Sequence, residues 1–202
     1  MEQLITKEEF DELMKIKGEA RGAGLKGEMK FILEEEGEEG LKKLEEAITK
    51  AGYPLKFKEI RGMDFYPIGL EAVVLLAIKR LFNYDDKKFQ EIGRRLAKFP
   101  LIVRLFIGYF TPSAKTLEKN LETWRKAFTI GNIKVVEVNL KEKYMIIRLE
   151  NFKVHPLFCQ VFIGSISSIT ELFIKTKLSC EETKCVFKGD EYHEFLLKEK
   201  KD

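Results

Sequence analysis

The spacing of apolar residues changes near residue 131, and this change constrains the fold more than any other feature of the sequence. From Thr6 to about Phe128 the apolar residues recur every three to four positions, which is the period of amphipathic helices. After Gly131 the period approaches two, as it does in strands with one buried face. This order predicts an α+β fold in which an N-terminal helical part packs on an antiparallel sheet.

Caps and helix-breaking residues indicate where the N-terminal helices begin. Thr6 and Glu9 have the spacing of a capping box, in which each side chain bonds to the backbone of the other residue. A group of glycines is expected to break the chain before a second helix begins near residue 29: Gly22, Gly24 and Gly27. Later helices are expected to start at Pro67, Asp85, Pro100 and Ser113.

The C-terminal third of the chain predicts the order β-β-α-β-β. Residues 133–140 and 144–149 form the first expected hairpin, and residues 177–187 and 192–198 form the second. Between the hairpins, Pro156 starts a helix that is apolar on one face. The other face of this helix consists of small residues, namely Gly164, Ser165, Ser167 and Ser168.

We expect a single domain over residues 1–202, mainly helical in residues 1–130 and with an α/β part in residues 131–199. Lys and Arg (36) nearly balance Asp and Glu (33), which argues against a nucleic-acid binder held by overall charge. The longest apolar runs, 66–78 and 99–110, are too short to cross a membrane.

Three cysteines imply no disulfide framework and favour a reduced, cytoplasmic setting. The abundance of Lys and Glu over Gln favours a thermophilic source.

Residue types that bind metals collect in the last quarter of the chain, where the register of one hairpin decides what they can do. If the turn centres on Gly189, Cys185 and His193 face each other across adjacent strands, close enough to share one Zn²⁺. A two-residue turn at Gly189 and Asp190 instead pairs Cys185 with Glu194 and directs His193 to the other face. The spacing does not choose between these registers.

Glu182 can join such a site only under a further condition. Strand alternation puts Glu182 and Cys185 on opposite faces, so a bulge must intervene or Glu182 must precede the regular strand. The alternative is that no metal binds here. In that case Cys159 and Cys185 are small buried residues and His193 is a surface residue of a strand.

The same part of the chain resembles the C-terminal signature of 4-vinyl-reductase-like domains, which bind small molecules. The resemblance lies in Cys159 to Gly164, Glu182-Thr-Lys-Cys185, Lys188-Gly189-Asp190, His193 and Phe195. It implies a structural zinc held by Cys159, Glu182, Cys185 and His193, in which His193 replaces the last cysteine of the family pattern. Looser matches upstream are Asp64-Phe-Tyr-Pro67, Gly93-Arg94, Trp124 and His155-Pro156.

The resemblance also implies a wider superfamily, which is shared with haem nitric-oxide sensors and TRAPP-type trafficking subunits that hold an acyl chain. The sequence nevertheless disfavours haem as a cofactor. His155 precedes Pro156 instead of lying within a helix, and the chain has no Tyr-x-Ser-x-Arg pattern of the kind that clamps a porphyrin in those sensors.

The helices that begin near Pro67 and Pro100 are more apolar than a single buried face requires, so they suit the wall of a cavity between helices and sheet. The side chains expected to line it are Phe106, Phe110, Trp124, Phe162 and Ile166. The alternative for these helices is a solid core or a dimer interface.

These observations predict a non-catalytic sensor or ligand-binding domain for an apolar small molecule or lipid, with zinc as a structural ion. The alternative is a homodimeric interaction module that has no small-molecule ligand. With either function we expect a homodimer that associates through helices of the first 130 residues. An enzyme is disfavoured because no nicotinamide or flavin fingerprint is present. The chain also has no recognisable DNA-binding segment, so a sensor of this kind must signal through a separate partner.

Overall fold

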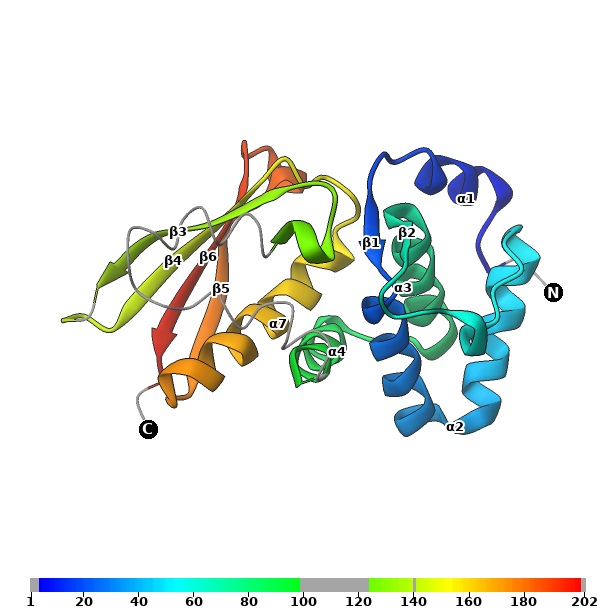
Figure 1. Cartoon of the computed structure of the whole chain (residues 1–202), viewed down its shortest axis with the longest axis horizontal. Coiled ribbons are helices and arrows are strands. Elements are labelled where there is room, and N and C mark those ends of the chain that lie inside the picture. The colour runs from blue at the N-terminus through cyan, green and yellow to red at the C-terminus, as the bar shows by residue number, and fades with distance from the viewer. Residues whose placement is uncertain (1–3, 99–123, 140, 201–202) are drawn as a thin grey trace.

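The computed structural model describes residues 4–98, 124–139 and 141–200 of the chain. A helical part comes first and a four-stranded sheet follows it, with helices α4 and α7 lying side by side between them (Figure 1). The elements of the first part are α1 (Lys7–Met14), β1 (Glu19–Arg21), α2 (Ala23–Ala51), η1 (Phe57–Glu59), β2 (Phe65–Pro67), α3 (Ile68–Phe82) and α4 (Asp86–Lys98).

The C-terminal part has the predicted order β-β-α-β-β. All neighbouring strands are antiparallel, in the spatial order β3-β4-β6-β5, and α7 packs on the sheet. The α+β fold class predicted from the change of period is therefore confirmed. The elements of this part are β3 (Asn132–Asn139), β4 (Tyr144–Glu150), α7 (Leu157–Ile174), β5 (Leu178–Lys184), η2 (Val186–Lys188) and β6 (His193–Glu199).

Several predicted helix starts are confirmed. Thr6 and Glu9 form both bonds of a capping box at the start of α1, and Asp85 accepts a hydrogen bond from the backbone N–H of Lys88. The helix α3 follows Pro67 directly. The helix starts expected at Pro100 and Ser113 lie outside the described residues.

The predicted chain break is correct at Gly22, which precedes α2 as its N-cap, but wrong at Gly24 and Gly27. The helix α2 begins at Ala23 and runs through Gly24 and Gly27, because these glycines provide close approach to other elements rather than a turn. A Cβ atom on Gly27 would lie 2.1 Å from the Cδ2 atom of Leu96. The interruption of α2 falls instead at Gly37, whose φ of 70° is outside the helical region. The short pair β1 and β2 was not predicted.

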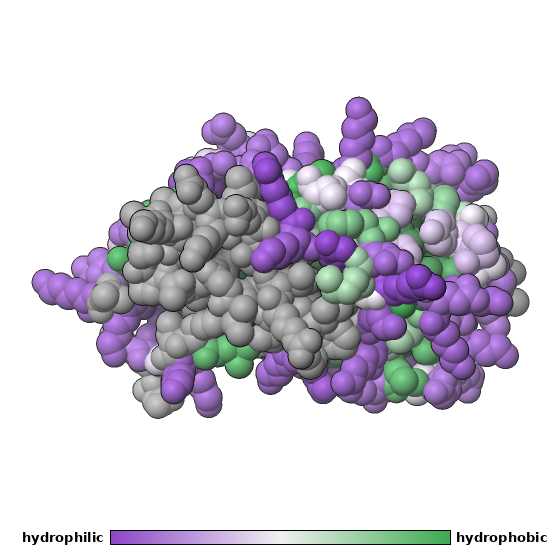
Figure 2. Space-filling model, in the orientation of Figure 1, coloured by the Kyte–Doolittle hydropathy of each residue, from purple (hydrophilic) through white to green (hydrophobic). Residues whose placement is uncertain are grey.

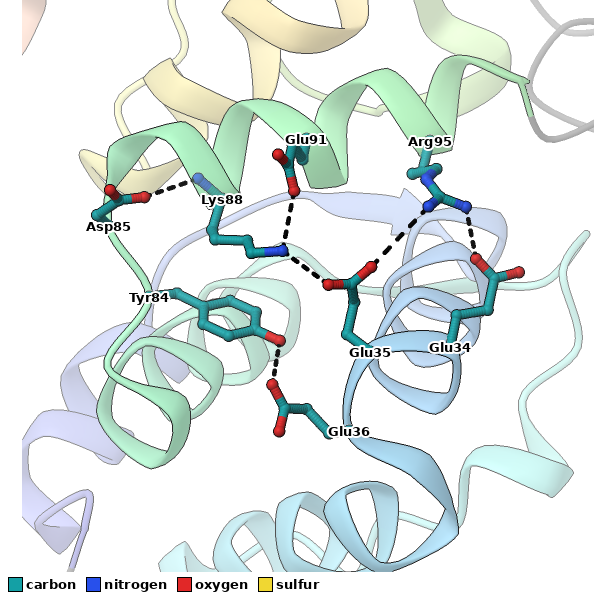
Figure 3. A network of polar contacts seen from close by, with 8 residues as sticks. All are labelled: Glu34, Glu35, Glu36, Tyr84, Asp85, Lys88, Glu91 and Arg95. Atoms are coloured by element: carbon teal, nitrogen blue, oxygen red, sulfur yellow. Dashed lines mark hydrogen bonds and ion pairs between the residues drawn. The ribbon is translucent and has the colours of Figure 1, made fainter.

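Three consecutive carboxylates end the first half of α2, and each of them contacts α4 or the residues just before it (Figure 3). The pairs are Glu34 with Arg95 (2.7 Å), Glu35 with Lys88 (2.7 Å) and Glu36 with the Tyr84 hydroxyl (2.5 Å). Partly exposed pairs of this kind contribute little free energy each. They do fix the position of α4 against the first half of α2.

The closest contact between the two parts of the molecule is the crossing of α4 over α7. A Cβ atom on Gly93 would lie 2.0 Å from the Val161 carbonyl oxygen, and one on Gly164 would lie 2.0 Å from the Gln90 carbonyl oxygen. The hydroxyl of Ser165 donates a hydrogen bond to the Gly93 carbonyl oxygen (3.1 Å). Gly164, Ser165 and Ser168 of the small face expected on α7 therefore contact the backbone of α4, whereas the hydroxyl of Ser167 donates hydrogen bonds within α7.

Hydrophilic residues cover most of the described surface on the side drawn in Figure 2, with small apolar areas between them. In the part of the chain that the structure describes, no helix combines the length and the hydropathy needed to cross a bilayer.

The helix crossing predicts a large cost for one added methyl group. We expect Gly164→Ala to lower the free energy of unfolding by about 3 kcal/mol, at the upper end for overpacking, because the new Cβ meets a backbone carbonyl that cannot rotate away. As a control, Ser165→Ala removes one hydrogen bond at the same crossing and is expected to cost about 1 kcal/mol. Urea unfolding measures both. Equal stabilities of Gly164→Ala and the wild type would contradict this account of the crossing.

Candidate metal centre and ligand cavity

Four side chains from three elements converge beside the start of α7. Cys159 lies in the first turn of α7, Glu182 on β5, Cys185 just after β5, and His193 at the start of β6. We call this group the Cys–Glu–His cluster. One possible ligand atom from each residue lies within 4.8 Å of the others. The structure thus brings together all four residues that the sequence placed at a metal site.

A bulge in the second hairpin makes this convergence possible. The pairing of β5 with β6 shifts register between Glu182 and Lys184, so Glu182 pairs with Phe195 while Lys184 pairs with Glu194. This is the bulge that Glu182 needs to share a face with Cys185. Cys185 then lies next to the start of β6, as in the register that centres the turn on Gly189.

The separation of the two sulfur atoms suits a shared metal ion. The Sγ atoms of Cys159 and Cys185 are 3.7 Å apart, and both cysteines are free thiols. Two thiolates bonded at roughly 2.3 Å to a tetrahedral Zn²⁺ lie about 3.8 Å apart. The Cys159 Sγ atom is also 3.8 Å from Nδ1 of His193.

Hydrogen bonding orients His193 so that one ring nitrogen faces the cluster. Its Nε2 atom lies 2.8 Å from the Phe152 carbonyl oxygen, which can only accept a hydrogen bond, so Nε2 carries the proton. This leaves Nδ1 directed at the cluster, as is usual for a metal-binding histidine whose other nitrogen is held by a carbonyl. His193 is 2% exposed, so its alternative placement as a surface residue is wrong.

The carboxylate of Glu182 is the member that would have to move to bind a metal. Its Oε1 atom lies 2.8 Å from Nδ1 of His193, which is a hydrogen-bonding distance. Two ligand atoms bonded at about 2.0 Å to one tetrahedral ion keep a separation of about 3.3 Å. The Glu182 side chain is therefore near a ligand position and needs a shift of about half an ångström to reach it.

The electrostatics of the cluster favour a cation. Burial raises the pKa of the Cys159 thiol, and the negative charges of Glu182 and Cys185 raise it further. Burial also acts to raise the pKa of Glu182, but its contacts with His193 and the two thiols outweigh burial and hold the pKa below its usual value. Thiolates in such surroundings form when a metal ion compensates their charge.

A cavity of about 90 Å³ lies between the helices and the sheet, beside the first turns of α7. We call it the central cavity. Of the five residues expected to line it, Trp124, Phe162 and Ile166 are on its wall, whereas Phe106 and Phe110 lie outside the described residues. The other lining residues are Arg21, Ala23, Gly24, Glu71, Leu96, Ala127, Phe128, Ile133, Ile147, Phe158, Val161, Ser165 and Ile169.

Aromatic rings connect the cavity wall with the Cys–Glu–His cluster. The ring of Phe152 lies 5.2 Å from that of Phe162 and 5.4 Å from that of Phe158, measured between centroids. The carbonyl oxygen of Phe152 is the group that binds Nε2 of His193. Two contacts therefore connect the cluster with the cavity wall: His193 with Phe152, and Phe152 with Phe162.

Two buried carboxyl groups lie at the helical side of the cavity, and the sequence analysis missed both. Glu71 lines the cavity and is 5% exposed, while Glu28 on α2 is fully buried. Burial raises the pKa of Glu71 to about 8, and burial together with the charge of Glu71 raises that of Glu28. The position of Glu71 inside an apolar run is a sequence signal for a buried carboxyl group. Glu28 lies among lysines and glycines, so the sequence gives no such signal for it.

No family model matches the sequence, and no curated protein matches it. Solved structures do match, at identities that establish the fold alone. An H-NOX protein from S. oneidensis in the Fe(II)NO ligation state has a TM-score of 0.64 and 10% identity, over 90% of this chain and 99% of that one. An oxygen-binding H-NOX domain related to soluble guanylate cyclases has a TM-score of 0.56 and 15% identity, over 90% and 95%.

A third similar structure comes from work on haem redox potential and porphyrin distortion, with a TM-score of 0.56, 14% identity and coverage of 88% and 99%. These matches overturn the expectation that disfavoured haem, because the fold of this chain is one that haem-binding domains use. They agree with the expectation that this chain shares its fold with haem-based sensors. A missing Tyr-x-Ser-x-Arg pattern is therefore too weak a reason to disfavour haem in a chain with this fold.

The residues described around the central cavity offer no axial ligand for haem iron. Histidine, cysteine, methionine and tyrosine are the usual protein ligands, and none of them is among the described lining residues. His193 belongs to the Cys–Glu–His cluster, and His155 precedes α7, where its Nδ1 accepts a hydrogen bond from the Leu157 N–H.

The buried acid at the cavity wall predicts a dependence of stability on pH. With a pKa of about 8 when folded and 4.5 ordinarily, Glu71 retains a proton in the folded state that the unfolded state releases. Stability is then full below about 4.5 and falls as pH rises towards about 8. We expect Glu71→Gln to flatten this slope in urea unfolding across that range, and the exposed Glu38→Gln to leave it unchanged. A slope that Glu71→Gln does not alter would contradict the assignment.

Proposed function

We propose that this chain is a non-catalytic ligand-binding or sensor domain. Its central cavity takes an apolar small molecule, and its Cys–Glu–His cluster holds a structural zinc ion. The observation that carries the proposal is the cavity itself, an apolar space at the junction of the helical part and the sheet. The likeness to H-NOX domains, one of them described as oxygen-binding, supports a sensory role.

The alternative is a homodimeric interaction module, in which apolar helices of the first 130 residues meet a second copy. A solid core would suit that module, since it needs no internal space. A packed protein interior leaves few voids larger than a water molecule, and the central cavity exceeds that size several-fold. The cavity therefore favours the binding domain.

Zinc at the cluster would connect three segments that are distant in sequence. It would join the start of α7 to β5 and to the start of β6, and a closed four-ligand site of this kind stabilises rather than catalyses. The donor set also agrees with the family pattern of 4-vinyl-reductase-like domains, to which we assign the chain as part of this proposal.

The zinc proposal predicts one zinc ion per chain in protein purified without a histidine tag. Cys185→Ser is expected to lose the ion and to lower the Tm by roughly 5 °C, because it removes a ligand and leaves the others unpaired. Cys180→Ser is the matched control, since Cys180 lies on β5 outside the cluster. The site is ruled out if elemental analysis finds no zinc, or if the Cys185→Ser variant has the same Tm as the wild type.

The cavity proposal predicts at least one clear stabiliser in a thermal-shift screen of fatty acids, phenols and tetrapyrroles. A ligand at a hundredfold excess over its Kd adds about 2.7 kcal/mol to the free energy of unfolding. Phe162→Trp is expected to abolish the shift by filling the space, whereas Phe82→Trp, outside the cavity, retains it. A screen without any stabiliser, or a shift that survives in Phe162→Trp, would count against the central cavity as the binding site.

A further inference from the structure

The carboxyl groups of Glu28 and Glu71 are buried without hydrogen-bond partners. Three of their four oxygen atoms are inaccessible to water and have no donor within reach: both oxygens of Glu28 and Oε2 of Glu71. A buried polar group without a partner costs free energy, and one that persists in a native structure calls for a specific reason. Here Glu71 lines the central cavity, and Glu28 lies close enough to Glu71 for their charges to interact.

The backbone around Glu71 is arranged to make room for its carboxyl group. Glu71 lies in the first turn of α3, and its Oε1 atom rests against Gly24 of α2, also a lining residue of the central cavity. A Cβ atom on Gly24 would lie 2.6 Å from that oxygen. Any other residue at position 24 would displace the carboxyl group.

The other polar side chains described on the wall already have partners. Arg21 donates hydrogen bonds to the carbonyl oxygens of Met63 and Lys126, and its guanidinium lies over the Phe65 ring. The hydroxyl of Ser165 donates to the Gly93 carbonyl. Among the described lining residues, Glu71 is therefore the polar group left for a ligand.

We infer that the central cavity binds an apolar amine, whose protonated nitrogen pairs with the carboxyl group of Glu71. This inference rests on the proposed function of the cavity and names the class of ligand. The remainder of the ligand lies among apolar side chains such as Phe162, Ile166 and Ile147.

An ammonium group meets the requirements of this site better than a hydroxyl or a carboxylate does. It has three N–H donors, whereas a hydroxyl has one and a carboxylate has none. It also brings the positive charge that two adjacent buried acids lack. A second carboxylate would add like charge to the pair instead.

The order of proton affinities agrees with such a pair. Glu71 has a pKa of about 8 in its buried setting. An alkylammonium group has a higher pKa, similar to the value of about 10.4 for the lysine side chain. When the amine enters, the nitrogen keeps its proton and the carboxyl group gives its proton up to solvent. The pair that forms is an ammonium with a carboxylate.

The chain carries its own reporter for the test, because its single tryptophan, Trp124, lines the cavity. We would titrate the purified protein with toluene, benzyl alcohol, benzylamine and benzoate near neutral pH and follow Trp124 fluorescence. The expected order places benzylamine about tenfold or more tighter than benzyl alcohol, with benzoate weakest. Glu71→Gln should remove the preference for the amine and leave toluene binding unchanged, whereas the exposed Glu38→Gln should alter neither.

The outcomes separate this inference from the proposed function. If toluene binds and benzylamine binds no tighter than benzyl alcohol, the amine assignment is wrong and the cavity stands. If Glu71→Gln retains the full preference, the assignment to Glu71 is wrong. If none of the four probes binds, the amine inference is wrong, and the thermal-shift screen decides whether the cavity is a ligand site. The wild-type comparison of amine with alcohol is decisive even if Glu71→Gln does not fold.

Discussion

The backbone contact between α4 and α7 is the constraint on which the rest of the structure depends. Gly93 and Gly164 let the two helices approach until each backbone touches the other, with no room for a Cβ atom between them. Carboxylates of α2 also form ion pairs with Lys88 and Arg95 of α4 and so hold α4 against α2 (Figure 3). The crossing of α4 with α7 therefore sets the distance between the helical part and the sheet. The central cavity is the space that remains beside it, with Leu96 of α4 and Ser165 of α7 both on its wall.

The first turns of α7 connect the two candidate sites. Phe158 faces the central cavity and the next residue, Cys159, faces the Cys–Glu–His cluster. The segment before the helix is held by the bond between the Phe152 carbonyl and His193, and the Phe152 ring packs on Phe162 of the cavity wall. A metal ion at the cluster would thus hold one wall of the cavity in place. In the proposed ligand-binding domain, a structural ion would therefore support the ligand site.

Much of the fold follows from local patterns in the sequence, and the exceptions have physical reasons. The change in the spacing of apolar residues predicts the α+β fold class, and the small residues on one face of α7 mark where another helix can approach. Gly24 and Gly27 look like helix breakers because their role, close contact with Glu71 and Leu96, depends on partners far along the chain. The burial of Glu28 has the same origin. The cysteine and histidine positions were visible, but the bulge that unites them with Glu182 arises only from strand pairing.

The most direct test of this account is a crystal structure determined under xenon pressure. Apolar cavities that water leaves empty take up xenon, which is located by its anomalous scattering. We expect a xenon atom bounded by Ile147, Phe162 and Ile166. A crystal in which those three side chains contact one another, with no xenon between them, would contradict the claim that this fold encloses a ligand site.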